Sequence, residues 1–194
     1  MTINKFYQLA NQKKNQKINL RPNPRLPPLD KNLLLSVSRP YPNRVVLSAL
    51  SNNRRVAKLV VQPQNLWLLN NNSQKSSTNG TRGGTPIKVL YLLEGETNHN
   101  FRERGIGEYL RRLANNLARE SGFYATNQLS VNLEKNSNSN SNSNSNSNRG
   151  PPPSARIMTR LGFRRVPPPN SNYVNNSAYY FRKVYNLKRK RNNS

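Results

Sequence analysis

The stretch Arg102-Glu-Arg-Gly-Ile-Gly-Glu-Tyr-Leu-Arg-Arg-Leu113 places two glycines directly before an amphipathic run. Apolar side chains continue at helical spacing through Ile106, Leu110 and Leu117, while arginine and asparagine occupy the other face. Gly122 follows the last turn, where a left-handed helix cap is expected. The stretch therefore predicts a glycine turn followed by a helix. The other predicted elements lie before or after this helix in the sequence.

Candidate strands lie on both sides of the predicted helix. The run at 87–93 is apolar nearly throughout, so we expect it to be buried on both faces of a sheet. Residues 70–84 are rich in Asn, Ser, Thr and Gly and read as a loop. A second, shorter helix is expected at 155–161, capped by Ser154 and stopped by Gly162. The other runs with strand character are 44–50, 56–61, 66–69, 129–133 and 178–185.

The composition excludes several kinds of chemistry. The chain has no cysteine and a single histidine, His99. Disulfides, thiol nucleophiles and thiolate metal sites are therefore ruled out, and no metal site is expected. No apolar run approaches the roughly 18 to 20 residues that span a bilayer, so no membrane partner is expected. The start of the chain lacks the apolar core of a secretory signal.

The charge of +25 is unevenly distributed along the 194 residues. Residues 1–84 carry +13, residues 85–135 carry +1, and residues 136–194 carry +11. Basic flanks on a nearly neutral centre favour an RNA phosphate backbone as partner, and the alternative is a generic solubility effect. The cations expected to contact RNA are Lys13, Lys14, Arg21, Arg25, Lys188, Arg189, Lys190 and Arg191.

The glycine turn has a chemistry of its own. Because Gly105 and Gly107 lack a Cβ, backbone N–H groups can face an anion there, and the helix dipole adds to the attraction. The turn is not a Walker A loop, since Lys-Ser/Thr is missing, and it lacks the third glycine of a dinucleotide fingerprint. Taken alone, the motif is better explained as a simple turn before a helix.

Two segments together resemble the GNAT superfamily of N-acetyltransferases. Arg102 to Gly107 resembles the family's Arg/Gln-x-x-Gly-x-Gly/Ala signature, and Ala155 to Phe163 resembles its short helix ending in Leu-Gly-Phe. The resemblance covers roughly residues 87–185. It implies an α/β (α+β) fold with a mixed, mostly antiparallel sheet, a central splayed pair of parallel strands (87–93 and 129–133) and flanking helices.

The resemblance also implies a domain plan. Residues 43–185 would form the GNAT-like domain, interrupted by a low-complexity Asn-Ser and Pro insert at 136–153. Residues 1–42 would form a basic arm rich in Pro and Asn, and residues 186–194 a basic tail. The high Asn content resembles that of proteins encoded in fungal mitochondrial genomes, so a mitochondrial location is expected.

The implied activity is transfer of an acetyl group from acetyl-CoA to an amine by direct attack. The family's cofactor site corresponds here to Leu92, Leu93, Arg102, Glu103, Arg104, Gly105, Ile106, Gly107 and Glu108. Glutamates near the strand ends are the candidates for a general base, namely Glu94, Glu96 and Glu134. Where the family often has a tyrosine acid, this chain has Met158, which cannot donate a proton.

Two functions therefore stay open at this point. One is an active acetyltransferase. The other is a weak or inactive protein of the same fold that binds RNA, for example as part of a mitochondrial ribosome. The paired motifs favour the first function, and the basic flanks together with Met158 favour the second.

Overall fold

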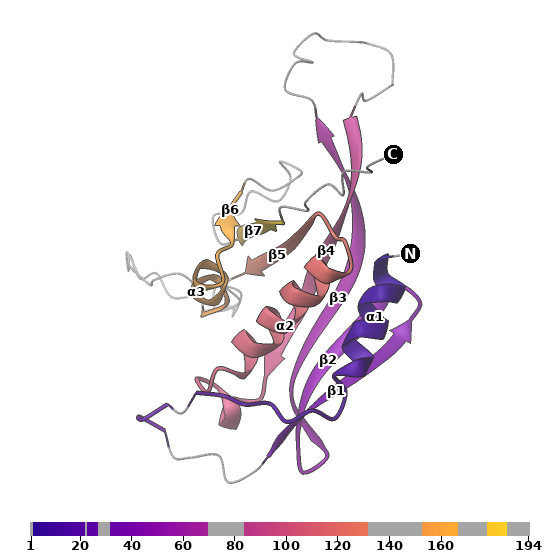
Figure 1. Ribbon diagram of the computed structural model, residues 1–194. Helices are drawn as coiled ribbons and strands as arrows, with labels where there is room; N and C mark the ends of the chain where they lie inside the picture. Colours follow the sequence, from indigo (N-terminus) through magenta and orange to yellow (C-terminus); the bar gives the residue numbers. More distant parts are fainter. Residues whose placement is uncertain are drawn as a thin grey trace, which may run out of the picture. The chain divides into compact units, whose positions relative to one another are not determined.

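The computed structural model describes residues 2–21, 23–26, 32–69, 84–131, 153–166 and 178–185. The chain divides into two compact units, Met1–Thr126 with Val184–Ser194, and Asn127–Lys183. Figure 1 shows the elements of both units. Within the described residues, no helix has the length and apolarity needed to cross a membrane.

A twisted antiparallel sheet forms the frame of the first unit. Its strands follow one another as neighbours, each paired with the next: β1 (Leu33–Tyr41), β2 (Arg44–Ser51), β3 (Arg54–Leu69) and β4 (Gly84–Thr97). Short turns at Pro42–Asn43 and Asn52–Asn53 join the first three strands. Asn52 and Asn53 both have positive φ, the conformation that a tight hairpin needs.

One pair of neighbouring strands in the sheet is parallel. Strand β5 (Ala125–Val131) lies next to β4 and runs parallel to it. In the second unit the order continues from β5 to β7 (Ala178–Val184) and β6 (Arg164–Arg165), and the last two strands pair antiparallel. The expected fold class, a mixed and mostly antiparallel sheet with one parallel pair and flanking helices, is confirmed.

Two helices of the first unit pack on the sheet and on each other. The first is α1 (Thr2–Gln12), which contacts β1 and β3, and the second is α2 (Ile106–Glu120), which contacts β2, β3 and β4. The one-turn 3-10 helix η1 (His99–Phe101) precedes α2, and α3 (Pro153–Arg160) belongs to the second unit. The helix predicted after the glycine turn is confirmed.

Helix α2 ends as its sequence predicts. Gly122 takes a left-handed conformation, with φ of 83°. Its N–H donates to the Arg119 carbonyl at 3.1 Å, and the Phe123 N–H donates to the Ala118 carbonyl at 3.0 Å. These two bonds form a Schellman cap, which satisfies carbonyls that a helix end leaves unpaired.

The interpretation of residues 1–42 as a basic arm is wrong for much of that segment. Thr2–Gln12 is a helix that buries Phe6 and Ala10 completely, and Leu33–Tyr41 is a strand of the sheet. Residues 15–18 also pair with β1, because Ile18 donates its N–H to the Leu33 carbonyl at 2.7 Å. These residues therefore belong to the core of the first unit.

Three strand predictions need smaller corrections. The run 66–69 is the end of β3 and not a separate strand. Strand β4 extends from Gly84 to Thr97, and Leu93 is 37% exposed, so the strand is not buried on both faces throughout. Strand β5 begins at Ala125, four residues before the predicted 129–133. Of the insert predicted at 136–153, Pro153 is the first residue of α3, and the rest lies outside the described residues, as do Glu134 and the tail from 186.

Replacing Phe6 with alanine tests whether the first helix is part of the core. Its ring meets the Phe123 ring edge-on with centroids 6.4 Å apart, and neither side chain is exposed. We expect Phe6→Ala to lower the free energy of unfolding by about 3–5 kcal/mol. Urea unfolding followed by circular dichroism measures this change, with the exposed Lys5→Ala as control. If the two variants are equally stable, the first helix is not part of the core and the arm interpretation holds.

Candidate functional site

The turn before α2 is built on left-handed residues. Glu103 has φ of 61° and Gly105 has φ of 80°, and Gly105 serves as the N-cap of the helix. The Gly105 carbonyl accepts the first helical bond, from the Tyr109 N–H at 2.9 Å. A Cβ placed on Gly105 meets no heavy atom within 4 Å, so the space before the helix is open. An anion there would face the N–H groups of the first turn, which lack helical partners.

A buried arginine lies directly behind this turn. Arg111 is 5% exposed, and its Nη1 donates to the Gly107 carbonyl at 3.1 Å. A Cβ placed on Gly95 of β4 would lie 2.5 Å from Nη2 of Arg111, and a Cβ on Gly107 would lie 3.3 Å from Nη1. The guanidinium therefore fills the room left by two glycines, one on β4 and one in the first turn of α2.

Burial lowers the pKa of the Arg111 guanidinium to about 10. The side chain therefore still carries its positive charge at neutral pH. Thr97 lies close by, because its Oγ1 is 3.5 Å from a Cβ placed on Gly107. A fixed cation behind the helix N-terminus strengthens the attraction for an anion in front of it.

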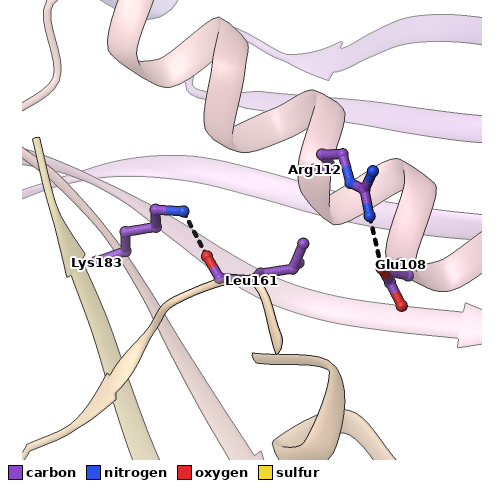
Figure 2. A network of polar contacts seen from close by, with 4 residues as sticks. All are labelled: Glu108, Arg112, Leu161 and Lys183. Atoms are coloured by element: carbon purple, nitrogen blue, oxygen red, sulfur yellow. Dashed lines mark hydrogen bonds and ion pairs between the residues drawn. The ribbon is translucent and has the colours of Figure 1, made fainter. Parts of the chain in front are cut away.

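The other charged residues of the predicted cofactor site lie at its rim. Arg102 is exposed, and its Nε donates to the Thr97 carbonyl at 3.4 Å. Arg112 forms an ion pair with Glu108 at 2.7 Å, one helical turn apart, as Figure 2 shows. Glu108 is therefore neutralised by its neighbour, so its charge does not oppose an anion at the turn.

A β-bulge marks the middle of β4. Leu92 pairs with Val61 of β3 and Glu94 pairs with Val60, so Leu93 has no partner on that strand. Leu92 is 1% exposed and packs in the core, whereas Leu93 is partly exposed. Bulges of this kind turn a backbone group away from the ladder and are common beside active sites.

The two predicted carboxylates of β4 converge on one lysine. Lys58 of β3 places its Nζ 2.8 Å from Glu94 Oε1 and 3.3 Å from Glu96 Oε2. Hydrogen bonding to Glu94 raises the pKa of Lys58. Because Gly95 points to Arg111, the side chains on either side of it point to the opposite face of the sheet. This face can therefore bind an ammonium group, as the position of Lys58 demonstrates.

A small cavity adjoins Glu96. It has a volume of about 140 Å³ and is lined by Arg55, Val56, Ala57, Lys58, Glu96 and Asn98. His99 lies beyond it, exposed, with its Nδ1 2.8 Å from the Asn100 Oδ1. Glu134, the third predicted base, lies outside the described residues. No group of three His, Asp or Glu side chains suited to a metal ion occurs in the described ranges.

The second motif has a structural explanation in its own unit. Gly162 is left-handed, with φ of 77°, and the Phe163 N–H donates to the Met158 carbonyl at 3.0 Å. The Leu161 carbonyl accepts a bond from the Lys183 ammonium of β7 (Figure 2). Leu-Gly-Phe is thus the Schellman cap of α3, and the fully buried Met158 is a core side chain.

Sequence reasoning missed Lys58 and Arg111, which complete the two halves of the site. The neighbouring sequence does not mark either residue as functional. Lys58 lies within a strand rich in β-branched residues, and Arg111 is next to a second arginine. The only available hint was Gly95, since a glycine inside a strand indicates a close approach by another group.

No family model and no curated protein sequence matches the chain. Solved structures with a similar fold include Arabidopsis thaliana NAA60 with acetyl-CoA, 15% identical, with a TM-score of 0.47 over 75% of this chain and 78% of that one. PaiA N-acetyltransferase from Thermoplasma acidophilum with coenzyme A is 11% identical, with a TM-score of 0.45 over 74% of this chain. This chain spans 62% of the PaiA chain.

Nourseothricin acetyltransferase is 17% identical, with a TM-score of 0.44 over 81% of this chain and 74% of that one. All three TM-scores lie below 0.5. At 11–17% identity these likenesses concern the fold alone.

Replacing Gly95 with alanine tests the contact between β4 and Arg111. The new methyl group would overlap the buried guanidinium, so we expect Gly95→Ala to lower the free energy of unfolding by about 1–3 kcal/mol. In an Arg111→Ala background the same change should cost much less, because the clash is gone. Urea unfolding of the four proteins gives the coupling energy, and additive effects would contradict the contact.

Proposed function

We propose that the chain is an acetyl-CoA-dependent N-acetyltransferase of the GNAT type. The observation that carries this proposal is the open glycine turn at Gly105, which begins α2 directly after β4 of the parallel pair. A glycine turn that opens a helix is a common place for a phosphate-bearing ligand, because backbone N–H groups there lack helical partners.

The residues present fit the phosphates of coenzyme A. The N–H groups of Ile106 and Gly107 face the open space before α2, and Arg111 supports them from behind. Arg102 adds an exposed cation at the rim. Acetyl-CoA would supply the acetyl group as an activated thioester. The backbone N–H of Leu93, at the bulge, is the group we assign to hold the acetyl carbonyl oxygen.

The acceptor amine would approach Glu94 and Glu96 on the opposite face of β4. These carboxylates bind an ammonium, as their contacts with Lys58 at 2.8 Å and 3.3 Å illustrate. Glu94 follows the bulge directly, so we assign it the role of general base that takes the proton from the attacking amine. Arg111 lies on the other side of β4, and Glu94 is paired instead with Lys58, whose ammonium the incoming amine would displace.

A mitochondrial location is proposed on composition alone. Asparagine supplies 34 of the 194 residues, and the chain is strongly basic with a single acid, Asp30, before Glu94. Such composition is typical of an AT-rich gene.

A matched pair of substitutions at Gly105 tests the phosphate site. Asn and Asp have nearly the same size and both tolerate the left-handed conformation, so they differ mainly in charge. We expect Gly105→Asp to weaken coenzyme A binding roughly tenfold relative to Gly105→Asn, because its carboxylate would repel the phosphates. Isothermal titration of the full chain measures both affinities. If the unmodified chain does not bind coenzyme A, the proposed function is wrong. If Gly105→Asp and Gly105→Asn bind coenzyme A equally well, the phosphates do not bind at this turn.

Glutamine substitutions test the assignment of the base. Glu94→Gln should lower kcat/KM for acetyl transfer about 100-fold or more at neutral pH while leaving coenzyme A affinity unchanged. Release of the coenzyme A thiol in the presence of a panel of primary amines gives the rate. Glu120→Gln, an exposed site at the end of α2, serves as control. A larger loss in Glu96→Gln than in Glu94→Gln would transfer the role to Glu96.

A further inference from the structure

An exposed tyrosine lies at the tip of the β1–β2 hairpin. Tyr41 is 57% exposed, and the Arg44 guanidinium lies 5.5 Å from its ring centroid. The two residues also face each other in the strand register. Arg44 is held in place from the other side by Gln62, whose Oε1 accepts a bond from its Nε at 3.2 Å.

A second pair of the same kind lies beside the first. Arg39 of β1 places its guanidinium 5.5 Å from the ring centroid of Tyr7 in α1. Its Nη2 donates to Asn4 Oδ1 at 2.7 Å, and its Nε donates to the Pro42 carbonyl at 3.0 Å. These bonds join α1 to the hairpin turn, so the two tyrosine–arginine pairs lie at the same end of the hairpin, one on each face of the strands.

The hairpin surface, defined as Tyr7, Arg39, Tyr41 and Arg44 around this turn, carries two cations and no acid. Asp30 is the only acidic residue of the sequence before Glu94. The ion pairs found among the described residues involve Lys58 and Arg112, and none includes a cation of the hairpin surface. The charge of this surface is therefore available to an anionic partner.

We propose that the hairpin surface binds single-stranded RNA. Bases would stack on Tyr41, while Arg44 beside it and Arg39 at the turn would contact the phosphate backbone. Exposed aromatic rings interleaved with arginine are the features that single-stranded nucleic acid uses, because every base has a face that can stack. An anionic membrane would need apolar side chains that insert, and this surface offers only tyrosines.

This surface is separate from the site of the proposed function. Strand β2 begins at Arg44 and ends at Ser51, and Arg54 follows across the next turn. The carboxyl end of β4 pairs with the start of β3, because Thr97 lies opposite Ala57. The glycine turn therefore lies toward the far end of β2, which spans roughly 25 Å at the usual rise per residue. RNA binding can thus be tested without disturbing the candidate cofactor site.

Fluorescence anisotropy of a labelled oligouridylate of about 20 nucleotides, titrated with the full chain, tests the proposal. Tyr41→Ala should weaken binding about tenfold, because the stacking face is lost, whereas Tyr41→Phe should bind as the unmodified chain does. Arg44→Ala should lower the slope of log affinity against log salt by about 0.7. Arg54→Ala removes the same charge at the other end of β2 and should leave affinity within about twofold.

Three results would overturn the proposal. If Arg54→Ala weakens binding as much as Arg44→Ala, the attraction is a property of the whole charge and not of this surface. If Tyr41→Ala binds RNA as tightly as Tyr41→Phe does, no base stacks on this side chain. If the unmodified chain binds phosphatidylserine vesicles but not RNA, the surface is assigned to a membrane. Circular dichroism of each variant confirms that the comparison is made between folded proteins.

Discussion

The buried Arg111 guanidinium is the constraint on which the geometry of the first unit depends. It occupies the space that Gly95 and Gly107 leave between β4 and the first turn of α2. A charged group at 5% exposure needs hydrogen bonds, and the Gly107 carbonyl supplies one of them to Nη1. This contact joins the first turn of α2 to the buried cation and lies directly beside the open space at Gly105.

The elements that the sequence predicted best are those with a local signal. Helix α2 has a wide apolar face and a glycine cap, and both are visible within a few turns of chain. Helix α1 was missed although Ile3, Phe6, Tyr7 and Ala10 follow helical spacing, because the basic and proline-rich composition of residues 1–42 indicated an arm. Only Phe6 and Ala10 are fully buried, and the remaining positions are largely polar. The prolines near β1 had the same effect on that strand.

The candidate site divides in a similar way. The glycine turn could be predicted because its conformational demand is carried by the glycines themselves. Lys58 and Arg111 could not, because their roles arise from register and packing. Lys58 meets Glu96 only because the two residues pair across β3 and β4. The Leu161-Gly162-Phe163 motif shows the opposite case, since α2 ends on Gly122-Phe123 with the same cap. A glycine–phenylalanine pair after a helix is thus evidence of how the helix ends, and is weaker evidence of membership in a family.

The alternation of side chains along β4 separates two kinds of charge. Gly95 faces the cationic side with Arg111, and Glu94 and Glu96 face the anionic side with Lys58. A phosphate-bearing ligand and an amine would therefore reach the strand from opposite faces and meet at the bulge of Leu93. Were the carboxylates on the same face as Arg111, they would pair with it and cancel the positive charge behind the glycine turn. One strand, with one glycine between two glutamates, thus keeps both binding functions apart while holding them within reach of the same backbone position.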